Sequence, residues 1–116
     1  MSEELSTTAS GLRKRLDEAE VLLAAVLQLR KDLNEEDIPL PKVGEQAFEE
    51  LRTAVLALLD GWQRTGSSAL SRAINRVDLT EAMVERALEL GGPKELAGFI
   101  VLRILQKVLI RERFAG

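Results

Sequence analysis

The chain of 116 residues contains no cysteine, no histidine and no tyrosine. Without cysteine it can form neither disulfides nor thiolate metal sites. Without histidine it also lacks the commonest general base and the commonest metal ligand. Only Asp, Glu, Lys, Arg, Ser and Thr remain for acid–base or nucleophilic chemistry. We therefore predict that the protein is not an enzyme and that it holds neither a metal nor a cofactor.

Long apolar runs are missing as well. The densest run, residues 96–102, contains Gly98 and ends at Arg103, so it is far shorter than the roughly 20 residues that cross a bilayer. The first residues, Met1 to Glu4, are acidic and no uninterrupted apolar stretch follows them, which does not fit a secretory signal. We expect a cytoplasmic protein that makes no contact with a membrane.

The net charge of −3 is unevenly distributed. Residues 93–116 carry five basic and two acidic side chains, whereas residues 1–92 carry 11 basic and 17 acidic ones. A negative total argues against a broad attraction to nucleic acid. The simpler interpretation of the basic C-terminal segment is that it packs against the acidic remainder of the chain, and the alternative is that it binds an acidic partner.

A heptad-like pattern dominates the first third of the chain. Nine positions are separated by alternating steps of four and three: Leu5, Ala9, Leu12, Leu16, Ala19, Leu23, Val26, Arg30 and Leu33. All of them except Arg30 are apolar. This pattern is typical of a coiled-coil seam on one long helix within residues 1–34. Such a helix would be about 40 Å long, longer than the roughly 35 Å diameter of a compact chain of this size. We therefore predict an elongated bundle or contact with a second chain, and we expect Arg30→Leu to raise the melting temperature because it removes a charge from the seam.

The remainder predicts a helical bundle over residues 44–116, joined to the first helix by a linker at residues 35–43 that contains Pro39 and Pro41. Prolines at these positions disfavour regular backbone hydrogen bonding. The predicted helices run from about Gly44 to Arg64, from Ser68 to Ile74, from Asp78 or Thr80 to Gly91, and from Pro93 to Phe114. Together they predict a single all-α domain, residues 1–116, with four to five helices.

The last predicted helix is apolar nearly all round, which is typical of a helix that is central in its fold or covered by another molecule. One side combines large apolar residues with cations: Phe99, Arg103, Lys107, Ile110 and Phe114. Apolar anchors beside cations suit an acidic amphipathic partner. We therefore predict these five as partner-binding residues, and the competing interpretation is that this side packs on the first helix of the same chain.

A second candidate site lies between Gln63 and Val77, where no acidic residue occurs. Its members are two serines at a predicted helix start and three arginines: Arg64, Ser67, Ser68, Arg72 and Arg76. Free amides at a helix start beside arginines can bind a phosphate or another anion. Loop serines with unrelated surface arginines are the commoner explanation of such a pattern.

These observations favour a protein–protein interaction module that acts as a homo-oligomer, most simply a dimer. It would be a small helical adaptor, a chaperone-like protein or a regulatory subunit. The alternative is a nucleic-acid-binding regulatory protein in which a dimer brings Arg13, Lys14 and Arg15 of two chains together.

Overall fold

The computed structural model describes residues 9–115, with side chains up to Glu112, and this part of the chain contains six helices and no strand. The helices are α2 (Ala9–Arg15), α3 (Ala19–Asp32), α4 (Ala47–Thr65), α5 (Ala69–Val77), α6 (Glu81–Gly91) and α7 (Pro93–Ala115). The all-α prediction is therefore confirmed, with more helices than the four to five expected. Of the described helices, none combines the length and the hydropathy that a membrane span requires.

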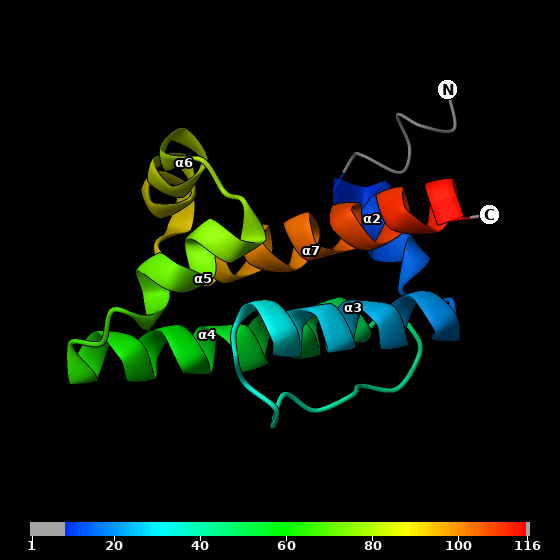
Figure 1. Ribbon diagram of the computed structural model, residues 1–116, viewed down its shortest axis with the longest axis horizontal. Coiled ribbons are helices and arrows are strands. Elements are labelled where there is room, and N and C mark those ends of the chain that lie inside the picture. Colours follow the sequence, from blue (N-terminus) through cyan, green and yellow to red (C-terminus); the bar gives the residue numbers. More distant parts are fainter. Residues whose placement is uncertain (1–8, 116) are drawn as a thin grey trace.

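Helix α7 is the centre of the fold. It packs against each of the other five described helices, and Figure 1 shows it running along the molecule with α3 and α4 on one side and α6 on the other. Its fully buried side chains cover about half of the circumference of the helix: Leu96, Ala97, Ile100, Val101, Ile104, Leu105 and Val108. On the other half, Phe99, Leu102 and Leu109 are partly buried against the core. The nearly uniform apolar character of this helix is thus explained largely by its own chain.

Helix α4 lies close to α7 because α7 carries a glycine at the contact. A Cβ atom at Gly98 would meet Cδ of Arg52 at 3.3 Å and Cζ of Phe48 at 3.8 Å. The same Phe48 ring is covered by the guanidinium of Arg13, whose Cζ lies 4.1 Å from the ring centroid. This cation–π contact attaches α2 to the start of α4.

The prediction of one long N-terminal helix is wrong, because the chain turns between α2 and α3. The amides of Leu16 and Asp17 donate to carbonyls three residues back, at 3.1 and 3.0 Å, and the acidic Glu18 then stands before the first turn of α3, where negative charge is favoured. The bend lets α2 fold back over α7. Consequently Ala19 and Leu23 are exposed while Leu12 and Leu16 are buried, so the predicted seam is not one continuous face.

The shape is compact rather than elongated, which corrects the second part of that prediction. The molecule measures 41 × 29 × 25 Å, with a radius of gyration of 13.5 Å. A compact domain of about 100 residues has a radius of gyration of about 13 Å. Because α2 and α3 pack separately on α7, the first third of the chain does not form the single helix of about 40 Å that the elongated shape was predicted from.

The segment between α3 and α4 is irregular and returns along α3 (Figure 1). It is attached there by Arg30, whose Nε donates to the carbonyl oxygen of Ile38 at 2.9 Å, and the Ile38 side chain is buried. Arg30 therefore has a structural partner that the seam interpretation did not foresee.

The turns before and after α6 use three conformationally special residues. Asp78 ends α5 in the left-handed region with φ 66°, and Thr80 caps α6 by accepting a hydrogen bond from the amide of Met83 at 3.1 Å. Gly92 ends α6 with φ 74° directly before Pro93 opens α7. Asp78 and Thr80 were both predicted as possible caps of this helix, and in the structure Thr80 caps it.

Candidate functional site

An apolar groove lies between α2, α6 and α7. Its volume is about 130 Å³, and its lining residues are Ala9 and Leu12 from α2, Met83 from α6, and Phe99, Leu102, Arg103 and Gln106 from α7. Because α2 folds back at residue 16 and α6 is held by its Thr80 cap, two separate helices form the walls and α7 forms the floor.

The floor of the groove follows from the periodicity of α7. Steps of three and four residues from Phe99 to Arg103 and Gln106 place these side chains on one face of the helix. Phe99 is half-buried and Arg103 is also partly covered, with its Nη1 donating to Oε1 of Gln106 at 3.5 Å. The groove is therefore apolar along most of its length and has one cation at its polar edge.

The structure divides the five predicted partner-binding residues. Phe99 and Arg103 line the groove, and Ile110, which is 51% exposed, lies about two turns beyond Arg103 on the same face. Lys107 instead contacts its own chain: its Nζ lies 2.6 Å from Oδ2 of Asp32 and 2.8 Å from the carbonyl oxygen of Arg76. The side chain of Phe114 lies outside the described residues.

Lys107 belongs to a buried polar network that joins α3 to α7. Asp32 and Gln28 are both buried, and Nε2 of Gln28 donates to Oδ1 of Asp32 at 2.8 Å. On the opposite side, Nη2 of Arg111 donates to Oε1 of Gln28. Every polar atom of this network that is fully buried has a partner, so its role is to hold the helices in register. The ion pair of Lys107 with Asp32 is a contact between the basic C-terminal segment and the acidic remainder of the chain, as the simpler interpretation of the charge distribution predicted.

The groove residues that sequence reasoning missed come from other helices. Leu12 was assigned to a seam and Met83 lies in the helix predicted to end at Gly91, and no pattern within either segment relates them to Phe99. Leu102 follows Phe99 by three residues and was detectable from the helical period alone.

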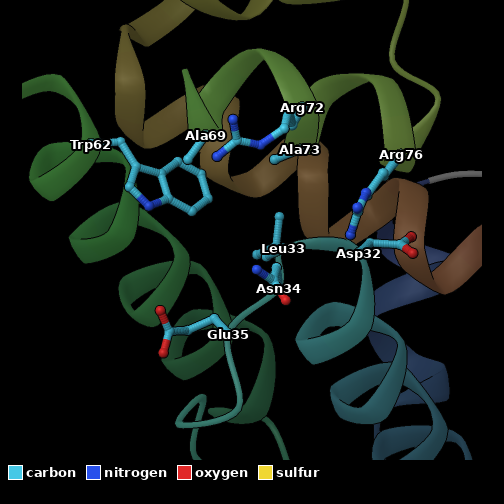
Figure 2. Close-up of a pocket in the computed structure, with 9 residues that line it drawn as sticks. All are labelled: Asp32, Leu33, Asn34, Glu35, Trp62, Ala69, Arg72, Ala73 and Arg76. Atoms are coloured by element: carbon cyan, nitrogen blue, oxygen red, sulfur yellow. The ribbon is translucent and has the colours of Figure 1, made fainter. Parts of the chain in front are cut away.

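A second, more polar pocket lies where α3 ends, between α4 and α5 (Figure 2). Its volume is about 160 Å³, and it is lined by Asp32, Leu33, Asn34, Glu35, Trp62, Ala69, Arg72, Ala73 and Arg76. Figure 2 shows the guanidinium of Arg72 pointing toward the Trp62 indole, whereas that of Arg76 points toward Asp32.

Only two of the five predicted anion-binding residues meet in this pocket, namely Arg72 and Arg76. The hydroxyl of Ser67 accepts from the amide of Ala69 at 3.0 Å, and that of Ser68 accepts from Nη1 of Arg72 at 2.6 Å. Arg64 lies outside the pocket lining, and its Nε donates to the carbonyl oxygen of Asp60 at 3.4 Å. The hydroxyls of Ser67 and Ser68, which were predicted to help bind an anion, are therefore engaged within the chain. Arg72 and Arg76 instead border the pocket that contains Trp62 and Asp32.

The three consecutive basic residues of α2 are largely engaged by their own chain. Arg13 covers Phe48, and Arg15 forms ion pairs with Glu18 and, at 3.4 Å, with Glu112 of α7. The hydrogen bond with Glu18 raises the pKa of the Arg15 guanidinium above its ordinary value. Lys14 is exposed.

Four large apolar side chains are exposed on α3 and on the segment that returns along it. They are Leu23, Leu27, Leu40 and Val43, each about half exposed. We call these four residues the α3–linker patch. On α3, Leu27 and Leu23 precede Arg30 by three and seven residues and so lie on the same side of the helix, the side that Arg30 uses to contact Ile38.

Among the described side chains, no group of three or more carboxylates is arranged to hold a metal ion. Comparison with known proteins gave no match to this chain, whether with protein-family models, with curated proteins or with solved structures. The function is therefore inferred from the residues themselves.

Proposed function

We propose that the protein is a non-enzymatic interaction module that binds an acidic, amphipathic segment of a partner protein in the groove between α2, α6 and α7. The observation that carries this proposal is the juxtaposition of an apolar floor, formed by Phe99 and Leu102, with the cation of Arg103. Protein interfaces commonly combine an apolar centre with a polar rim, and helix-in-groove recognition uses anchors spaced along one helical face.

The size of the groove supports one anchor rather than a row of anchors. An apolar cavity of about 150 Å³ accommodates a benzene ring, and the groove has a similar volume of about 130 Å³. One large apolar side chain of the partner would therefore fill it, between Met83 and Phe99. A carboxylate one turn away on the partner would then reach Arg103, and Ile110 would extend the apolar contact along α7.

Selection from a random peptide library tests this proposal. We expect the selected sequences to carry a large apolar residue with Asp or Glu one helical turn away. Binding measured by fluorescence anisotropy should weaken at least about tenfold in Met83→Lys, which places a charge in the groove, and in Arg103→Glu, which reverses the recognising charge.

Two matched variants serve as controls. Leu88→Lys makes the same kind of apolar-to-basic change on the opposite side of α6, at a residue that is 47% exposed. Lys31→Glu reverses an exposed charge on α3. Both should bind like the wild type. Selected sequences with basic residues beside the anchor, or equal losses in Leu88→Lys and Met83→Lys, would contradict the proposal.

We propose further that the protein self-associates through the α3–linker patch. Large exposed apolar side chains can mark an interaction surface. The four residues of the patch are each about half exposed, and the segment that carries Leu40 and Val43 is attached to α3 through Arg30 and Ile38. Sedimentation equilibrium from micromolar to millimolar concentration should show a dimer that Leu27→Lys converts to a monomer while Leu88→Lys does not. A monomeric mass for the wild type over the whole range would reject self-association.

The nucleic-acid alternative has less support, because two of the three basic residues that it relies on, Arg13 and Arg15, contact side chains of the same chain. It predicts binding to a mixed pool of DNA and RNA at low salt that falls steeply as salt is added. Absence of binding at low salt would remove this alternative.

A further inference from the structure

The pocket at the end of α3 is bordered by two exposed arginines, and most of their guanidinium N–H groups donate to no described protein acceptor. Within the part of the chain that the structure describes, the guanidinium of Arg76 has no hydrogen-bond or ion-pair partner, since only its backbone carbonyl is used, by Lys107. Arg72 uses Nη1 to reach Ser68, which leaves its other N–H groups without a described partner. Two guanidinium groups with free donors therefore border one small cavity.

The charge around the pocket is also unbalanced. Of its two carboxylates, Asp32 is already paired with Lys107, and Gln28 donates to its other oxygen. Glu35 is half-buried and forms no ion pair with either arginine within the described residues. Two guanidinium groups thus face one carboxylate that is free to balance them, so a bound monoanion would complete the charge balance.

Apart from Asn34, the rest of the lining is apolar: Leu33, Trp62, Ala69 and Ala73. The half-buried Trp62 and the small residues Ala69 and Ala73 form the wall beside the arginines. Arg72 and Arg76 are separated by one helical turn, so their side chains emerge on the same side of α5 above Ala73. The volume of about 160 Å³ is close to that of a cavity that takes up benzene, about 150 Å³.

From these observations we propose that the pocket binds a small organic carboxylate, with its apolar body against Trp62 and its carboxylate hydrogen-bonded by Arg72 and Arg76. Arginine is suited to this role because its planar fork matches the two oxygens of a carboxylate. The site is separate from the groove between α2, α6 and α7, and the proposal does not depend on what that groove binds.

Trp62 provides a direct readout, because it is the one tryptophan of the chain and no tyrosine is present. Benzoate titrated into the full-length protein should change the tryptophan emission saturably, with a dissociation constant of about 1 mM or below. Benzamide has the same ring without the charge and should bind at least about tenfold more weakly. Inorganic phosphate, an anion without an apolar body, should bind more weakly than benzoate.

Arginine variants distinguish this site from general electrostatic attraction. Arg76→Gln should weaken benzoate binding about tenfold or more, and because Lys107 uses the backbone carbonyl of residue 76, this substitution preserves that contact. Arg64→Gln removes an equivalent charge outside the pocket and should leave the affinity unchanged. Helix content measured by circular dichroism confirms that each variant is folded.

Four results would overturn the proposal. They are the absence of saturation with benzoate, equal binding of benzamide, equal losses in Arg64→Gln and Arg76→Gln, and binding of phosphate as tight as that of benzoate, which would indicate an inorganic anion site. The groove variant Met83→Lys should retain benzoate binding, so failure of one proposal is distinguishable from failure of the other.

Discussion

Replacing Lys107 with methionine tests the buried ion pair that joins α3 to α7. The ammonium of Lys107 lies 2.6 Å from the Asp32 carboxylate, and the exposed fractions of the two side chains are 21% and 8%. Methionine has a similar length and is apolar, so the substitution removes the charge while filling most of the same space. The Asp32 carboxylate is then left buried, with Gln28 as its remaining side-chain donor.

The expected loss follows from the burial of both partners. Removal of one partner from a fully buried ion pair typically costs about 3–5 kcal/mol. Because one-fifth of the Lys107 side chain is exposed, water can approach the carboxylate once the ammonium is gone, and we expect about 2–3 kcal/mol. For a domain of this size, this corresponds to a melting temperature lower by roughly 8–12 °C.

Urea and thermal denaturation followed by circular dichroism would measure this loss. A second substitution gives a sharper test, since Asp32→Asn removes the unpaired charge but retains an oxygen that can accept from Gln28. In the Lys107→Met background, Asp32→Asn should therefore increase stability, whereas in the wild type it should decrease stability. A loss below about 1 kcal/mol in Lys107→Met, or a decrease in both backgrounds, would show that the carboxylate is solvated and would refute the reasoning.

Three further substitutions test local features by the same denaturation assays. Arg30→Leu should lower the free energy of unfolding by about 1–2 kcal/mol, because it removes a charged donor from the Ile38 carbonyl; the stabilisation that a coiled-coil seam predicts would contradict this. Thr80→Ala should cost about 1 kcal/mol through loss of the cap of α6, and an unchanged stability would mean that the cap contributes nothing. Gly92→Ala should cost about 1–3 kcal/mol because its φ is positive, whereas Gly91→Ala, within the helix, should be neutral or slightly stabilising; equal effects of the two would argue against the left-handed turn.

Helical periodicity was sufficient to predict much of the fold. The apolar stripes that start near Phe48 and Leu96 predict α4 and α7, and Gly92 with Pro93 predicts the turn between α6 and α7. The break after Arg15 was not predictable in the same way, because the steps of three and four residues continue from Leu12 through Leu16 to Leu23. A continuous period cannot distinguish one helix from two helices joined by a single tight turn.

The candidate sites were only partly predictable, because each joins residues from several helices. Phe99 and Arg103 were identified from α7 alone, but the partner of Lys107 is Asp32, 75 residues earlier in the chain. In the polar pocket, the spacing of the two arginines on α5 was visible in the sequence, whereas the contribution of Trp62 depends on the packing of α4 against α5. Contacts of this range are set by tertiary packing and have no local sequence signal.

The central claim is that the groove between α2, α6 and α7 is the surface that recognises a partner. Chemical-shift mapping on isotopically labelled protein, titrated with a selected acidic amphipathic peptide, tests this claim most directly. We expect the largest backbone amide shifts at the groove-lining residues, with Met83, Phe99 and Arg103 among them. Shifts concentrated on α3 and the returning linker, or around Trp62, would contradict it.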